Sequence, residues 1–236
     1  MASAREEIMT RLHEALGRED GVTTRPGIVP STGKPVDLSA EVPRDYLRTG
    51  SLDHEVVIAQ LVDRLVDYRA GVVEAQPAEV PGVVAEKLAH ARSVVVPPAL
   101  ESGVLAGLER PVLAELDDSV AVTREDADTV LSVDELDRTS AVVTSSRVSC
   151  AQTGTIFLDG ASDCGRRAIS LVPDHHVCLV PESSIVEIIP EAVARIDSTR
   201  TITMISGPSA TSDIELERVE GVHGPRTLDV VIVRGV

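Results

Sequence analysis

Ser93-Val94-Val95-Val96-Pro97-Pro98 is the stretch that decides the fold class. A short apolar run closed by prolines is typical of a strand that is buried on both faces, as in a parallel sheet covered by helices. Apolar residues at helical spacing precede this run in 53–70 and 81–91, and short apolar strands follow it. The sequence therefore predicts an α/β fold with a mostly parallel sheet flanked by helices.

The remaining patterns predict where the other elements lie. Apolar and β-branched runs predict strands at 72–75, 112–116, 141–144, 148–151, 155–158, 177–180, 201–206 and 229–233. Helical patterns occupy 100–108 and 190–196, the second with Pro190 near its first turn. Ser132 and Glu135 have the spacing of a capping box, which predicts a short helix after Ser132.

The first fifty residues differ in pattern from the rest of the chain. Residues 3–16 place apolar side chains on one helical stripe, and Gly17 supplies a stop signal. Residues 18–50 contain four prolines and four glycines with little periodicity, which is typical of an extended arm. We therefore expect two parts: an amino-terminal helix with a Pro/Gly-rich arm at 1–50, and an α/β domain at 51–236.

The composition excludes several classes of function. The chain has 236 residues and a net charge of −16, which argues against nucleic-acid binding, because that affinity comes mainly from Lys and Arg on phosphates. Its aromatic residues are Tyr46, Tyr68 and Phe157 alone, too few for a base-stacking platform. No apolar run approaches the roughly 20 residues that span a bilayer, and the amino-terminal stretch lacks the apolar core of a signal peptide. We expect a cytoplasmic protein without a membrane span.

The cysteines limit the redox chemistry of the chain. Cys150, Cys164 and Cys178 are three in number and form no CxxC pair, so a disulfide framework is not expected. An all-cysteine iron–sulfur site needs about four thiolates, more than this chain supplies. The apolar neighbours of Cys150 and Cys178 predict buried strand thiols, and we expect no cofactor or metal in this chain.

Negative charge is concentrated in residues 115–137, which carry nine acidic residues and one basic residue. Such a segment is commonly a solvated flank of a domain. The same concentration would also suit a docking face for a basic partner, and the sequence does not decide between the two.

Ligands of an open parallel sheet bind at the carboxyl ends of its strands, so the segments that follow predicted strands are candidate sites. The first is Gln152-Thr153-Gly154-Thr155, where Gly154 permits a tight turn or the close approach of a ligand, and the threonines offer hydroxyl groups. A simple hairpin explains the same residues.

Two more loops offer groups that bind ligands. Residues 205–215 run from a strand into Gly207 and Pro208 and then into hydroxyl and acidic residues, a composition that suits an anion-binding nest or a capped turn. Residues 221–226 place His223 between glycines, where it would act as an acid, a base or a hydrogen-bond donor. Arg226 would clamp a carboxylate or phosphate, unless it simply faces solvent.

We expect these three loops to meet at one edge of a single parallel sheet and to form one pocket for a small anionic ligand. The candidate pocket residues are Gln152, Thr153, Gly154, Thr155, Gly207, Pro208, Ser209, Thr211, Asp213, Glu215, His223 and Arg226. No catalytic role is assigned to any of them. His175 and His176 are excluded as a joint site, because neighbouring residues of a strand point to opposite faces. Motifs of P-loop, zinc-protease and dinucleotide-binding proteins are absent.

Four stretches together resemble the lactate utilization protein C family, which is characterised by the LUD domain. They are AQTGTIFL (151–158), SLVPDHHVCLVPESSIVEIIPEAV (170–193), ISGPSATSDIE (205–215) and GVHGPRTLDVVIV (221–233). The resemblance implies a NagB/RpiA/CoA-transferase-like fold, that of sugar-phosphate isomerases and CoA transferases. It also implies a part in the cytoplasmic oxidation of L-lactate to pyruvate, with partner proteins that hold the iron–sulfur clusters. In this family the residue before Thr153 is usually acidic, whereas here it is Gln152, which cannot act as a general base or carboxylate nucleophile.

Three functions remain open. The protein would be a cofactor-free subunit of a lactate-oxidising assembly, so that lactate serves as a carbon source. Alternatively, it would be a small-anion, acyl- or sugar-phosphate-binding enzyme or sensor of the CoA-transferase-like superfamily. A structural domain whose pocket loops have degenerated is the third reading.

Overall fold

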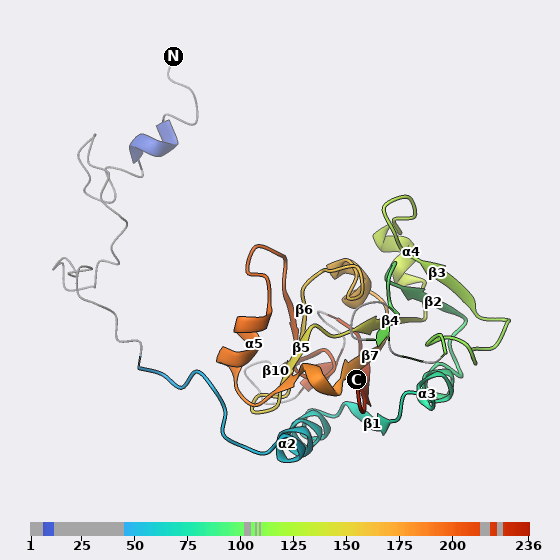
Figure 1. Ribbon diagram of the computed structural model, residues 1–236. Coiled ribbons are helices and arrows are strands. Elements are labelled where there is room, and N and C mark those ends of the chain that lie inside the picture. The colour runs from blue at the N-terminus through green and yellow to red at the C-terminus, as the bar shows by residue number, and fades with distance from the viewer. Residues whose placement is uncertain are drawn as a thin grey trace. The chain divides into compact units, whose positions relative to one another are not determined.

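The computed structural model describes residues 7–11, 45–101, 105–106, 108, 110–212, 218–220 and 224–236. The chain divides into two compact units, Met1–Tyr46 and Leu47–Val236. In the first unit, residues 7–11 of the predicted amino-terminal helix are helical, and the rest of that helix and most of the arm lie outside the described residues. The second unit contains the fold described below (Figure 1).

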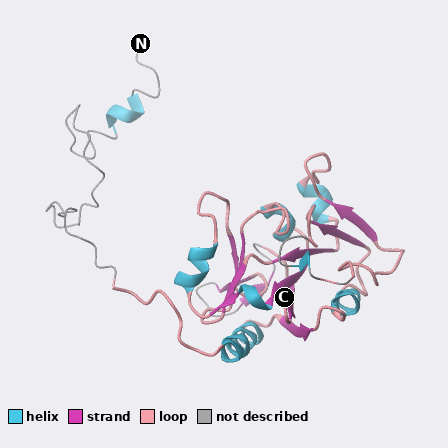
Figure 2. Cartoon of the chain, in the orientation of Figure 1, coloured by secondary structure: helices cyan, strands magenta, loops and turns pink. Residues whose placement is uncertain are grey.

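A parallel sheet forms the centre of the second unit (Figure 2). Its six strands among the described residues are β1 (Gly71–Ala75), β2 (Ser93–Val96), β3 (Ala121–Arg124), β4 (Ala141–Ser145), β7 (His175–Pro181) and β12 (Thr227–Val233). They lie in the order β1-β12-β7-β4-β2-β3, and each neighbouring pair is parallel. The α/β fold with a mostly parallel sheet is therefore confirmed, and the Val94–Val96 run is buried as predicted.

A smaller sheet contains strands that the sequence analysis assigned to the main sheet. Its strands are β5 (Val148–Cys150), β6 (Thr155–Leu158), β8 (Ile185–Val186) and β9 (Thr203–Ile205), in the order β8-β5-β6-β9. β6 is antiparallel to both β5 and β9, whereas β5 and β8 are parallel. A short antiparallel pair, β10 (Ala210–Ser212) and β11 (Arg218–Glu220), follows. The expectation of a single sheet is thus wrong.

Helices and the smaller sheet cover the two faces of the central sheet. The helices are α2 (His54–Asp67), α3 (Val80–Lys87), α4 (Val133–Asp137) and α5 (Ile189–Arg195), with short 3-10 turns at Arg167–Ser170 and Glu182–Ser184. Because side chains of a strand alternate between faces, Cys178 and Val180 pack against α2 and the smaller sheet, whereas Val177 and Leu179 pack against α3. Both faces of β7 are therefore buried, which explains its continuous apolar sequence.

Helix α2 is amphipathic and ends close to the candidate site. It buries Ile58, Leu61 and Leu65 against the central sheet. Arg69 then takes a left-handed conformation with φ of 67°, and the backbone N–H of Ala70 donates to the carbonyl oxygen of Leu65 at 2.9 Å. This turn ends the helix and directs the chain into β1.

The strand predicted at 112–116, between β2 and β3, is not found. Residues 111–116 form turns instead of a strand, because backbone hydrogen bonds close locally, from Ala114 to Pro111 and from Leu116 to Leu113. Val112 is nevertheless fully buried, because it packs in the same apolar cluster as α3 and the central sheet. The predicted helix 100–108 lies partly outside the described residues, and its described part shows only turns and a 3-10 segment at 105–106.

Candidate functional site

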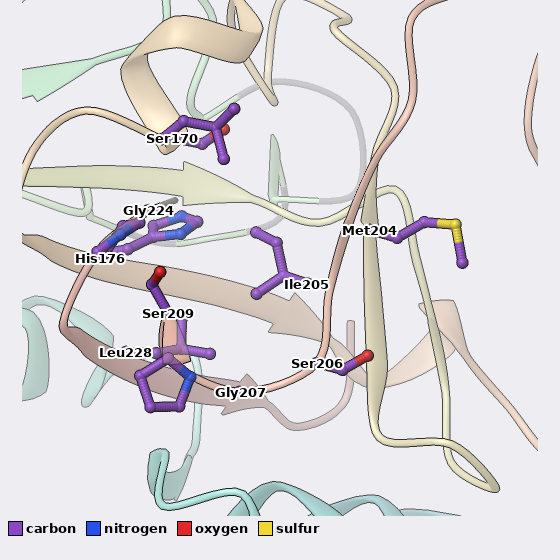
Figure 3. Close-up of a pocket in the computed structure, with 12 residues that line it drawn as sticks. Ser170, His176, Met204, Ile205, Ser206, Gly207, Ser209, Gly224 and Leu228 are labelled. Carbon is purple, nitrogen blue, oxygen red and sulfur yellow. The ribbon is translucent and has the colours of Figure 1, made fainter. Parts of the chain in front are cut away.

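The candidate site is a cavity of about 140 Å³ beside the amino ends of β7 and β12. It is lined by Ser170, Leu171, His176, Met204, Ile205, Ser206, Gly207, Pro208, Ser209, Gly224, Pro225 and Leu228. Figure 3 shows His176, Ser209, Gly224 and Leu228 gathered on one side, and Met204, Ile205 and Ser206 on the other. The cavity therefore lies between the central sheet and the segment that leaves the smaller sheet at β9.

His176 is the buried polar side chain of this cavity. It is the second residue of β7 and lies in register between Val142 on β4 and Leu228 on β12. The side chain is fully buried, its Nε2 lies 2.8 Å from Oγ1 of Thr144, and its Nδ1 has no hydrogen-bond partner. Burial lowers the pKa of His176 to about 3, with a smaller contribution from the neighbouring His175. The imidazole is consequently neutral at physiological pH.

His175 faces the other side of the sheet, as the alternation of a strand predicts. Its Nε2 lies 2.8 Å from Oδ2 of Asp229, and Oδ1 of the same carboxylate lies 2.9 Å from Nζ of Lys87. The hydrogen bond from His175 is the main cause of the lowered pKa of Asp229. Asp229 is thereby held as a carboxylate on the α3 side. The two histidines do not form a joint site. Because the sequence analysis considered them only as a pair, it missed His176 as a cavity residue.

The first two predicted loops lie together near the end of α2. Oγ1 of Thr155 is 2.8 Å from Oγ1 of Thr153 and 2.9 Å from Oγ of Ser206. Gly154 and Gly207 have φ of 59° and 85°, and a Cβ atom on either one would meet Tyr68. A positive φ and close packing therefore require both glycines. The sequence had indicated a tight turn or a close approach only at Gly154.

The second and third loops also meet. The backbone N–H of Ser209 donates to the carbonyl oxygen of Pro225 at 2.7 Å, and Gly224 faces Ser209 across the cavity wall. Gly207, Pro208 and Ser209 of the second loop line the cavity.

Of the other predicted site residues that the structure describes, those absent from the cavity lining are Gln152, Thr153, Gly154, Thr155 and Arg226. Gln152 is exposed, and the side chain of Thr211 is not described although its backbone belongs to β10. Asp213, Glu215 and His223 lie outside the described residues. Arg226 donates through Nε to Oδ1 of Asp174 at 2.6 Å and through Nη2 to Oδ2 of Asp174. The arginine thus clamps a carboxylate of the protein itself, and this hydrogen bond lowers the pKa of Asp174.

The expected position of the site is wrong in one respect. The loops around Gly154 and Gly207 follow strands of the smaller sheet, and the cavity lies at the amino ends of β7 and β12. The rule for carboxyl ends holds for ligands of an open parallel sheet. Here the smaller sheet packs over one face of that sheet, and the loop after β9 closes over His176 and Leu228 instead.

The cavity carries no ionised side chain among its lining residues, all of which belong to the described part of the chain. Leu171, Ile205 and Leu228 supply apolar walls, and the polar groups are hydroxyls, backbone and the neutral imidazole. Such a lining favours a molecule with a large apolar fraction and few polar atoms.

One cluster of potential metal ligands occurs among the described residues, and it lies away from this cavity. Asp159, Asp163 and Cys164 are buried, with ligand atoms within 4.8 Å of one another. The guanidinium of Arg147 donates to Asp159 at 2.9 Å and to Asp163 at 3.0 Å, so a protein cation is already paired with both carboxylates. Burial raises the pKa of the Cys164 thiol, which keeps it protonated. The arrangement is accounted for as a buried ion-pair network.

Within the part of the chain that the structure describes, we find no helix of the length and apolar character that crossing a membrane requires.

The fold and the cavity together define an α/β protein with a parallel central sheet, a small mixed sheet on one face and a largely apolar pocket between them. The family model of the LUD domain matches residues 59–233, and the chain therefore belongs to the LUD domain family.

Individual relatives agree with this assignment. Lactate utilization protein C of Deinococcus radiodurans is 39% identical over 236 residues, covering 98% of this chain and 96% of the relative. Lactate utilization protein C of Bacillus subtilis is 33% identical over 110 residues, covering 43% of this chain and 45% of the relative. The crystal structure of a DUF162 family protein from D. radiodurans has a TM-score of 0.61 and 37% identity, covering 78% of this chain and 99% of that one.

Proposed function

We propose that this protein is a component of a lactate utilization system, in which it acts in the cytoplasm with iron–sulfur partner proteins to oxidise L-lactate to pyruvate. The observation that carries the proposal is the 39% identity over 98% of the chain to a relative named lactate utilization protein C. Because the match also covers 96% of that relative, the two chains correspond over nearly their whole length.

The chemistry of the chain suits a subunit that carries no redox centre of its own. Oxidation of lactate to pyruvate removes two electrons and two protons, with one hydrogen leaving the carbon and the other leaving its hydroxyl group, so an electron acceptor is needed. Cys150, Cys164 and Cys178 are all buried, and burial raises the pKa of Cys178 to about 12. Protonated, buried thiols are poor cluster ligands and poor redox groups. Iron–sulfur clusters in partner proteins would supply the acceptor.

The acidic segment supports a docking face for such a partner. Glu125 is buried and accepts hydrogen bonds from Arg166 at 2.8 and 2.9 Å, so it has a structural role. Other acids of 115–137 are exposed, and Val122, Val130 and Val133 are exposed among them. Exposed carboxylates interspersed with exposed valines suit a partner surface rich in Lys and Arg.

Purification of the tagged full-length chain from cells grown on L-lactate tests the partner. We expect iron and acid-labile sulfide to co-purify, and to fall several-fold when Asp134 and Asp137 on α4 are both replaced by asparagine. The matched control replaces Asp63 and Asp67, two exposed acids on α2, by asparagine in the same way and should retain the partner. A wild-type preparation without iron would contradict the iron–sulfur partner. Equal retention by both double variants would contradict the docking face.

A further inference from the structure

One residue that lines the cavity has a polar atom that the protein itself leaves unpaired. Nδ1 of His176 is buried without a partner, although nearly all buried polar atoms of proteins are hydrogen-bonded. Of the described residues with such an atom, His176 is the one that lines this cavity. His176 lines the cavity but has 0% exposure, so a molecule seated there bonds Nδ1 only when the neighbouring side chains shift slightly to admit it.

The neighbours of His176 indicate which kind of group is missing. Oγ1 of Thr144 lies 2.8 Å from Nε2 of His176 and is positioned to donate to Sγ of Cys178 at 3.8 Å. A hydroxyl has one proton, so both contacts are satisfied when Nε2–H donates to Thr144 and Thr144 donates to Cys178. In this tautomer Nδ1 carries no proton and acts as an acceptor. The missing group is consequently a hydrogen-bond donor.

Charge and size restrict the ligand further. Among the described residues, no lysine or arginine lines the cavity, and burying a carboxylate without a partner is costly. The chain as a whole carries a net charge of −16, which also disfavours an anion. A cavity of 140 Å³ is close to the roughly 150 Å³ that holds a benzene molecule, so it accommodates about six non-hydrogen atoms.

We infer that the cavity between β7, β12 and the loop after β9 binds a small uncharged molecule that donates a hydrogen bond to Nδ1 of His176. Alcohols and primary amides with a short branched carbon chain have this chemistry. Leu171, Ile205 and Leu228 would contact the carbon chain, and the donor would face the imidazole. This ligand differs from the anion that the sequence analysis expected. The inference does not depend on a role in lactate utilization.

Three probes of equal size separate the requirements. Isobutyramide is neutral and donates, 3-methyl-2-butanone is neutral without a donor, and isobutyrate is an anion. Binding to the full chain, labelled with ¹⁵N-histidine, is followed by the NMR signals of the His176 ring, whose shifts also report which nitrogen is protonated. We expect isobutyramide to shift these signals, the ketone to bind about tenfold more weakly, and isobutyrate to leave them unchanged.

Two variants tie binding to the cavity. Gly224→Ala places a methyl group at ordinary contact distance, 3.6 Å from Cβ of Ser209, so it should narrow the cavity without unfolding the chain. We expect isobutyramide to bind this variant about tenfold more weakly, because a close-packed wall leaves less room. Gly235→Ala, whose new Cβ meets nothing within 4 Å, is the control and should bind normally. His176→Phe should abolish binding.

Several outcomes of these experiments would overturn the inference. Equal or tighter binding of isobutyrate, a protonated Nδ1 in the free protein, or no shift with isobutyramide at high millimolar concentration would each overturn the inference. So would unchanged binding to Gly224→Ala, provided that its melting temperature equals that of the wild type.

Discussion

Replacing Arg147 by methionine is expected to lower the free energy of unfolding by about 3 kcal/mol, because it leaves two buried carboxylates without their cation. Asp159 and Asp163 are each about 5% exposed, and the guanidinium of Arg147 bonds both of them. In a chain of this size the loss corresponds to a fall in melting temperature of roughly 6 to 12 °C. Thermal unfolding followed by circular dichroism measures it.

Two comparisons isolate the cause of this loss. Arg200→Met removes an exposed pair with Asp197 and should change stability by less than about 0.5 kcal/mol. Adding Asp159→Asn and Asp163→Asn to Arg147→Met should recover part of the loss, since the buried groups are then neutral. If Arg147→Met alone melts within about 2 °C of the wild type, the carboxylates are not held by Arg147 and this account of the cluster is wrong.

Replacing Gly207 by alanine is expected to cost about 3 kcal/mol of stability. Gly207 has φ of 85°, and an added Cβ would lie 2.6 Å from Cβ of Tyr68 and 3.0 Å from its carbonyl oxygen. The left-handed conformation alone costs roughly 1–2 kcal/mol, and crowding against α2 adds a similar amount. Urea unfolding at constant slope gives the difference.

Gly235→Ala is the matched control for Gly207→Ala. Its φ of 73° is similar, but no atom lies within 4 Å of the added Cβ, so only the conformational cost of about 1–2 kcal/mol remains. The difference between the two variants measures how closely the loop after β9 packs on Tyr68. Equal losses in both variants would mean that this packing does not position the cavity wall.

The central sheet was predictable because its strands are buried on both faces. Val94, Val95 and Val96 read as a continuous apolar run for that reason, and their strand has the predicted bounds. Strand β3 has the opposite character, since it lies at the sheet edge with Val122 46% exposed and reads as part of the acidic segment. Residues 112–116 read as a strand because they are apolar, but they form turns that bury Val112.

The site was predictable where backbone geometry leaves a local mark. Gly154 was singled out because glycine permits a tight turn, and its φ is positive, whereas Gly207 was chosen for the composition of its loop and lines the cavity. Pairing of strands into two sheets depends on contacts between residues far apart in sequence, such as Thr155 with Ser206, and no local pattern reveals it. His176 had one usable signal, a histidine within an otherwise apolar buried strand, which calls for a partner or a ligand.

Growth on L-lactate tests the central claim, a role in lactate utilization, most directly. A strain that lacks the gene should fail to grow on L-lactate as the sole carbon source, should grow normally on glucose, and should recover when the wild-type chain is supplied from a plasmid. Unimpaired growth of the deletion strain on L-lactate would contradict the account.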